Sequence, residues 1–130
     1  MDPETVLEDC AVEVSSDSYA VLTTSRPHDV SGAFATIDDG REVTHVVTED
    51  RLADVEPLDV ERGWALLTFD AVLPFELVGF LAVVASALAE HDVSIFALSA
   101  YSTDHVLVKT VDVERALEAL SELGCEIHRA

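Results

Sequence analysis

The 130-residue chain contains no asparagine and no glutamine, and Lys109 is its one lysine. Seven Lys and Arg residues stand against 26 Asp and Glu residues, so the formal net charge at pH 7 is −19. A protein that binds nucleic acid needs basic residues to neutralise the phosphates. The shortage of cationic side chains therefore argues against nucleic acid as a partner.

Long apolar runs are also missing. The longest helical stretch without a charged residue covers residues 77–89, which is shorter than the ~20 residues that a membrane-spanning helix needs. The first four residues are Met-Asp-Pro-Glu, and this acidic start lacks the apolar segment of a signal peptide. We therefore expect a soluble cytoplasmic protein without a membrane partner.

Metal-binding and disulfide patterns are absent from the sequence. The two cysteines, Cys10 and Cys125, form no CxxC pair and no zinc pattern, so we expect free thiols in a reducing compartment. The five histidines also fit no zinc or nickel spacing, and a metal site needs three or four converging ligands. They are His28, His45, His91, His105 and His128. We therefore predict neither a metal nor a cofactor.

The acidic surplus carries a second implication. Hydrophobic residues make up 49% of the chain, which is too much for a disordered protein with so high a charge. A folded surface with this charge repels itself in dilute buffer, whereas at molar salt the Debye length shrinks to ~3 Å. The composition favours an origin in a salt-accumulating halophile. An acidic protein from an ordinary cytoplasm is the alternative.

The second half of the chain shows a regular order of elements. An apolar strand is followed by a helix, two strands, an amphipathic helix and a closing strand. The predicted ranges are 64–69, 74–90, 93–101, 105–109, 112–123 and 125–128. This order is βαββαβ, so we predict the α+β class and a ferredoxin-like fold.

The first half reads as a shorter version of the same pattern. Strands are predicted at residues 19–24, 33–37 and 42–48, with a hairpin signal at Asp39-Gly40, and a short helix is predicted at 49–55. We expect two subdomains: a reduced one over residues 1–61 and a complete one over residues 62–130.

The first helix of the second half is apolar on two sides. Leu77, Leu81 and Leu88 belong to one apolar stripe, and Phe80 and Val83 to another. A helix of this kind must be covered on both sides. One side is expected to pack on the sheet, and the other on a second domain or another subunit. A homo-oligomer such as a dimer, or a regulated protein partner, is therefore predicted.

Residues 69–81 and 87–99 resemble an ACT domain. They show a loop, a Gly-x-Leu sequence that opens a helix at Gly79, then Leu-Ala-Glu and a β-branched strand. The following segment is Tyr101-Ser-Thr-Asp-His-Val-Leu-Val-Lys109, which resembles the tandem ACT family related to the CASTOR arginine sensors. The first half is similar more loosely, through Gly32-Ala-Phe-Ala and the strand that begins at Glu42.

The resemblance implies a non-catalytic regulatory or sensor module that binds a free amino acid where the first loop meets the first helix. The helix N-terminus would attract the carboxylate, and Asp104 would hold the amine or a cationic side chain. The candidate ligand-binding residues are Asp70, Phe75, Leu77, Val78, Gly79, Ser99, Ser102, Thr103 and Asp104.

The residues themselves leave other interpretations open. Asp104 follows Ser102 and Thr103, so it also suits a plain turn, and Gly79 also suits close packing of the helix on a strand. The serines and the threonine can satisfy backbone groups at strand ends.

An enzyme is not expected, because no Ser-His-Asp or Cys-His pattern has local support. Acylphosphatases share the ferredoxin-like fold, but they use an arginine and an asparagine at the phosphate loop. This chain has no asparagine, and its loop at residues 70–75 has no basic residue. A ligand-free interaction or oligomerisation domain with the ACT shape is the alternative function, since fold does not settle function.

Overall fold

The computed structural model describes residues 2–25, 30–74 and 77–130. The chain divides into two compact units. The larger unit contains Met1–Ser16 and Ala65–Ala130, and the smaller unit contains Asp17–Trp64. The predicted assignment of residues 1–61 and 62–130 to two ACT-like subdomains stays a prediction.

Two long strands, β1 (Ala11–Thr24) and β4 (Asp59–Asp70), contribute residues to both units. The remaining elements of the larger unit are α1 (Pro3–Glu8), α2 (Phe80–Glu90), β5 (Ile95–Ser99), β6 (Asp104–Lys109), the 3₁₀ turn η2 (Thr110–Asp112), α3 (Val113–Glu122) and β7 (Glu126–Arg129). From β4 onward the order is βαββαβ. The predicted α+β class and ferredoxin-like fold are therefore confirmed.

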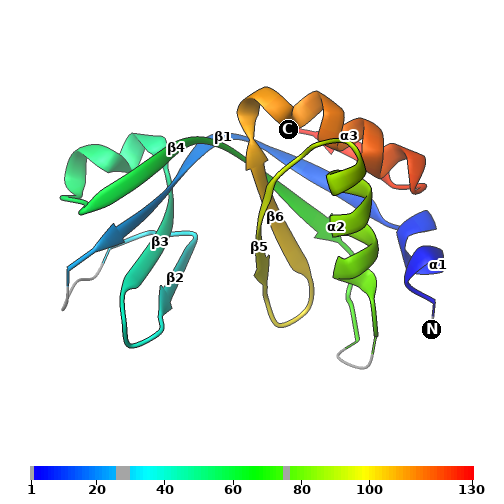
Figure 1. Cartoon of the computed structure of the whole chain (residues 1–130), viewed down its shortest axis with the longest axis horizontal. Helices are drawn as coiled ribbons and strands as arrows, with labels where there is room; N and C mark the ends of the chain where they lie inside the picture. The colour runs from blue at the N-terminus through cyan, green and yellow to red at the C-terminus, as the bar shows by residue number, and fades with distance from the viewer. Residues whose placement is uncertain (1, 26–29, 75–76) are drawn as a thin grey trace. The chain divides into compact units, whose positions relative to one another are not determined.

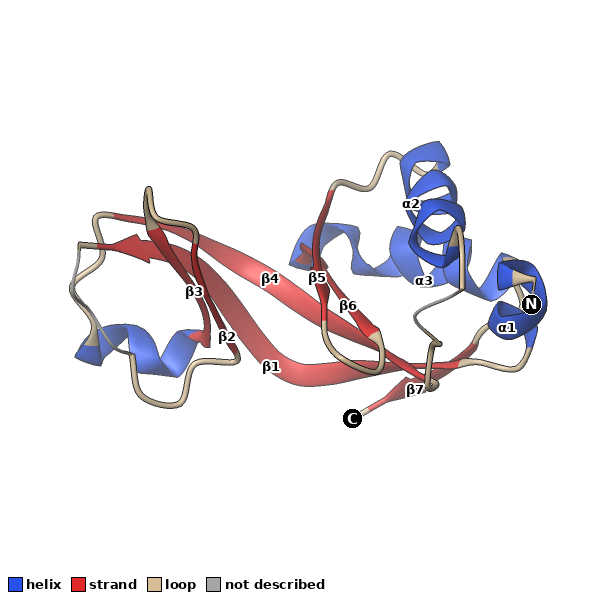
Figure 2. Ribbon diagram, turned by 90° about the horizontal axis from the view of Figure 1, so that it is seen from below, coloured by secondary structure: helices blue, strands red, loops and turns tan. Residues whose placement is uncertain are grey.

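The strands of the larger unit follow the order β7–β1–β4–β6–β5. Strands β5 and β6 pair antiparallel, whereas β7 runs parallel to β1. The helices α1, α2 and α3 cover the same face of this sheet (Figures 1 and 2). Within the described residues, no helix is long and apolar enough to cross a membrane.

The smaller unit is mostly strand. It contains β2 (Ala35–Asp38), β3 (Val43–Thr48) and the 3₁₀ helix η1 (Glu49–Asp54). The predicted hairpin is present, because β2 and β3 pair antiparallel. Asp39 stabilises the turn with its carboxylate, which accepts backbone N–H groups of Arg41 and Glu42 at 2.9 and 3.0 Å.

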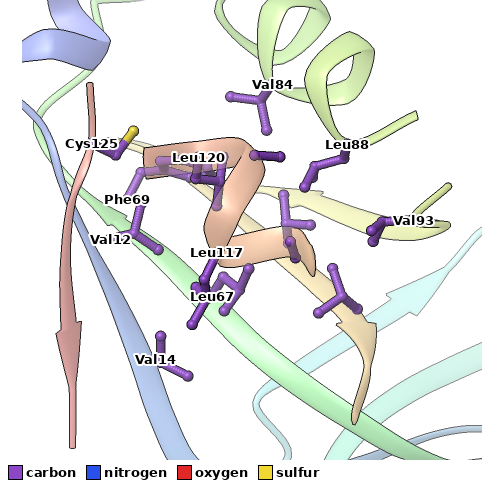
Figure 3. Close-up of a cluster of buried hydrophobic side chains, with 14 of the residues drawn as sticks. Val12, Val14, Leu67, Phe69, Val84, Leu88, Val93, Leu117, Leu120 and Cys125 are labelled. Carbon is purple, nitrogen blue, oxygen red and sulfur yellow. The ribbon is translucent and has the colours of Figure 1, made fainter. Parts of the chain in front are cut away.

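The core of the larger unit lies between the sheet and its helices. Figure 3 shows Val84 and Leu88 of α2 and Leu120 of α3 in the same cluster as Leu67 and Phe69 of β4. All five are fully buried. The amphipathic pattern of α3 explains its packing, since Val113, Ala116, Leu117 and Leu120 are buried while Glu114, Glu118 and Glu122 are exposed.

Helix α2 begins at the later of two expected positions. The residue pattern placed its start near Pro74 and the ACT resemblance placed it near Gly79, and its first residue is Phe80. Gly79 precedes it with φ of +87°, and a helix cannot continue through this left-handed conformation. Its buried residues are Phe80, Val84 and Leu88, so one fully buried stripe replaces the two predicted stripes.

The N-terminal helix α1 was not predicted. Its signal was present, because Asp2 accepts the N–H of Glu4 at 3.0 Å as the N-cap and Pro3 occupies the first helical position. Leu7 then joins the main core with no exposed surface. The residues before Asp17 therefore complete the larger unit, although they are distant from most of it in sequence.

Candidate functional site

A pocket of about 410 Å³ lies in the larger unit, between the first turn of α2 and the turn that joins β5 to β6. It is lined by Leu73, Pro74, Leu77, Gly79, Phe80, Leu81, Ala82, Ser99, Ala100, Tyr101, Ser102, Thr103 and Asp104. Three separate chain segments form it: the loop after β4, the start of α2, and the ends of β5 and β6.

Hydrogen bonds hold the first and third of these segments together. The backbone N–H of Leu73 donates to the carbonyl of Ser102 at 2.7 Å. The Thr103 hydroxyl donates to the carbonyl of Phe69 at 2.8 Å. The Ala100 N–H donates to the Thr103 carbonyl at 2.9 Å and closes the turn. These hydrogen bonds connect the chain at Phe69 and Leu73 to the turn between β5 and β6.

The first turn of α2 presents its positive end to the pocket. Phe80, Leu81 and Ala82 are its first three residues and all line the pocket. The N–H groups of a first turn have no acceptor within the helix, and the helix dipole favours an anion there. Gly79 is needed for conformation rather than space, since the nearest atom to an added Cβ would be Pro3 Cγ at 3.8 Å.

The opposite wall carries one carboxylate. Asp104 is the single acid among the described lining residues, and none of these is Lys or Arg. Asp104 and Ser99 are direct partners across the β5–β6 pair, so strand pairing brings a carboxylate and a hydroxyl to the same place. The pocket thus combines an anion-attracting helix end with a cation-attracting side chain.

Aromatic packing and a histidine lie beside the two walls. Phe80 packs edge-to-face on the fully buried Phe69, with ring centroids 5.2 Å apart. His105 follows Asp104 on β6 and its Nδ1 lies 2.9 Å from the hydroxyl of Thr68. Burial lowers the pKa of His105 below its usual value, and the charge of Asp104 partly opposes that effect.

The pocket brings together six of the nine predicted ligand-binding residues: Leu77, Gly79, Ser99, Ser102, Thr103 and Asp104. Asp70 and Val78 are not among the lining residues, and the Val78 side chain is 82% exposed. Phe75 lies outside the described residues.

Seven lining residues are not among the nine named candidates. Four of them lie within the predicted segments 70–79 and 99–104, namely Leu73, Pro74, Ala100 and Tyr101, whereas Phe80, Leu81 and Ala82 lie outside both. Those of the α2 first turn would have followed from starting the helix at Phe80. The ACT resemblance already opened the helix at Gly79, and glycine is a favoured residue at the N-cap.

Residues 59–122 match the family model described as the ACT domain. These residues form an ACT domain. The match extends from β4 into α3 and includes every described segment that lines the pocket. No curated protein matches the sequence.

Solved structures share this ACT fold. A protein from Agrobacterium tumefaciens has a TM-score of 0.78 and 23% identity, covering 93% of each chain. A protein of unknown function from Vibrio cholerae has a TM-score of 0.74 and 25% identity, covering 93% of this chain and 94% of that one. The ligand-free regulatory subunit of aspartate kinase from Thermus thermophilus has a TM-score of 0.63 and 14% identity, covering 86% of this chain and 95% of that one.

Proposed function

We propose that the protein is a non-catalytic regulatory module that binds a free amino acid in the pocket at the start of α2. The observation that carries this proposal is the pairing of the α2 first turn with Asp104 around one pocket. An α-amino acid has a carboxylate and an ammonium group close together, so these two features are complementary to it. ACT domains are typically regulatory modules that bind amino acids, which supports the same function.

In this proposal the N–H groups of Phe80, Leu81 and Ala82 hold the ligand's carboxylate. Asp104 accepts the ammonium group, and Ser99 and Ser102 supply further hydrogen-bonding groups. The rest of the lining includes several apolar side chains, among them Leu73, Leu77 and Leu81. Because Asp104 can neutralise one cation, the site favours an amino acid with an uncharged, apolar side chain.

The surface beside the pocket suggests how binding is passed on. Val78 and Tyr101 are each 82% exposed, and Val72 is 81% exposed. Contiguous exposed apolar patches mark sites of protein contact, and these three residues lie in the segments that flank or line the pocket. We propose that a second copy of this chain, or a regulated partner, covers this region. The ligand-free interaction domain is therefore the second candidate function.

The relation to the CASTOR-type tandem ACT family, the halophilic origin and the cytoplasmic location belong to the same proposal. They rest on the sequence. Residues 101–109 support the relation to the CASTOR-type family, and the net charge of −19 supports the halophilic origin. These proposals determine the buffer for the decisive experiment, which is molar KCl.

The test is thermal unfolding with each of the twenty amino acids at millimolar concentration. A ligand at ~100 times its dissociation constant stabilises a protein by about 2.7 kcal/mol, which raises the Tm by several degrees. The variant Asp104→Ala should weaken the binding of that amino acid by about 1.5–3 kcal/mol, as expected for a charged hydrogen bond.

Two controls sharpen the result. Asp54→Ala removes an exposed acid from η1 in the smaller unit and should leave the affinity unchanged. Asp70→Ala separates the sequence-based site, which includes Asp70, from the observed pocket, which does not. If no amino acid raises the Tm, the interaction-domain function replaces this one. Light scattering would then test self-association.

A further inference from the structure

Three metal-ligating side chains converge at the end of α2 that is remote from the pocket. His91 directly follows α2, and Glu118 and Glu122 lie on α3. One ligand atom from each lies within 4.8 Å of the other two. His91 Nε2 and Glu122 Oε2 are 3.2 Å apart. Neither the ACT fold nor the proposed amino-acid pocket uses these residues.

The hydrogen bonding of His91 determines which ring nitrogen faces the carboxylates. Its Nδ1 lies 3.1 Å from the carbonyl of Ala87, one helical turn earlier. A carbonyl can only accept, so Nδ1 carries the proton. The other ring nitrogen, Nε2, then faces Glu122, whose Oε2 lies 3.2 Å away. Histidines that bind metals generally donate their other N–H in this way, often to a backbone carbonyl.

The distance between His91 and Glu122 also suits a single ion. Glu118 and Glu122 are four residues apart on a helix, so they lie on the same face. Two ligands of a tetrahedral zinc ion, with bonds of ~2.0–2.2 Å, are separated by about 3.3–3.5 Å. The 3.2 Å between His91 Nε2 and Glu122 Oε2 is close to this value. A metal ion between the two atoms would take the place of the proton that joins them in a salt bridge.

Solvent access and charge are compatible with a cation. The side chains of His91 and Glu122 are 24% and 62% exposed. The nearby cation, Arg115, is engaged elsewhere: one of its nitrogens donates to the His91 carbonyl at 3.4 Å and another pairs with Asp112. The strongly negative net charge of the chain also raises the local concentration of cations.

We propose that His91, Glu118 and Glu122 bind a divalent transition metal of the zinc class. Imidazole nitrogen with carboxylate oxygen suits such ions, whereas Mg²⁺ and Ca²⁺ prefer oxygen ligands alone. A bound ion would join the end of α2 to α3. The 11 residues of α2 separate the metal site from the pocket, which is about 16 Å at 1.5 Å per residue. Loss of metal binding is therefore distinguishable from loss of amino-acid binding.

The test is calorimetric titration of the whole chain, after chelator treatment, with zinc chloride. We expect one ion per chain, and a loss of affinity of at least tenfold in His91→Ala, Glu118→Gln and Glu122→Gln. The matched control is His128→Ala, which removes an exposed histidine that pairs with Glu126 at 2.9 Å but lies outside the cluster. Its affinity should be unchanged, and magnesium chloride should give no binding.

A spectroscopic measurement supplies a second readout. Co²⁺ bound through His91 should give the visible absorption of a low-coordinate ion, and that absorption should disappear in His91→Ala. The proposal is overturned if zinc fails to bind with one-to-one stoichiometry, or if His91→Ala retains the affinity. An equal loss of zinc affinity in His128→Ala and in His91→Ala would also overturn it. If His91→Ala fails to fold, the exposed Glu122→Gln decides the question.

Discussion

Removing the Thr103 hydroxyl should loosen the turn that forms one wall of the pocket. In the folded chain this hydroxyl donates to the carbonyl of Phe69 at 2.8 Å. The variant Thr103→Val keeps the branched shape and its restricted χ1 but removes the donor. The Phe69 carbonyl also accepts the N–H of Ala71 at 2.9 Å, so the substitution does not leave it without a partner.

The size of the effect follows from that second hydrogen bond. An orphaned buried carbonyl would cost ~1–3 kcal/mol, whereas the loss of one of two bonds costs about 0.5–1.5 kcal/mol. We therefore expect Thr103→Val to lower the free energy of unfolding by about 1 kcal/mol. For a chain of this length that corresponds to a fall in Tm of about 4 °C.

Urea unfolding followed by circular dichroism measures this directly. The midpoint should fall while the m-value stays constant, because the surface exposed on unfolding does not change. Thr103→Ser keeps the hydroxyl and is the matched control, so it should lie closer to the unsubstituted protein. An unchanged urea midpoint in Thr103→Val would contradict the stabilising role of this hydrogen bond, and so would an equal loss of stability in Thr103→Ser.

Two further predictions concern residues around the same pocket. NMR titration of His105 should give a midpoint below the usual value of about 6.5, since burial lowers its pKa, and Asp104→Asn should lower it further because it removes an opposing charge. The folded state then binds fewer protons than the unfolded state. His105 should therefore make the free energy of unfolding fall as the pH drops below about 6.5 toward the folded pKa. A titration midpoint of His105 above that of the urea-unfolded chain would contradict this. Gly79→Ala should lower the free energy of unfolding by about 1–2 kcal/mol, because Gly79 has φ of +87°, and an unchanged urea midpoint would show that the start of α2 adapts without strain.

Much of the fold followed from local patterns in the sequence. The apolar stripe and outward acids of α3 identify a helix packed on one side, and the Asp39-Gly40 dipeptide identifies a hairpin. The order of elements from β4 to β7 was sufficient to predict the ferredoxin-like fold. These signals are local, since each depends on residues within one element or one turn.

The start of α2 shows where local patterns fail. Pro74 suits a helical first turn and Gly79 does not favour a helix interior, yet residue preferences alone left the boundary open. The left-handed conformation of Gly79 decides it. The pocket depends on this boundary, because its anion-attracting wall is the first turn from Phe80 to Ala82.

The sequence by itself determined the class of fold, the ACT-like order of elements, the acidic charge and six of the residues that line the pocket. Only the tertiary structure decided that α1 joins the larger unit, that β7 pairs in parallel with β1, and that His91 meets Glu118 and Glu122. The physical reason is that these contacts join segments far apart in the chain. Their positions depend on how the core between the sheet and its helices packs, which no local pattern specifies.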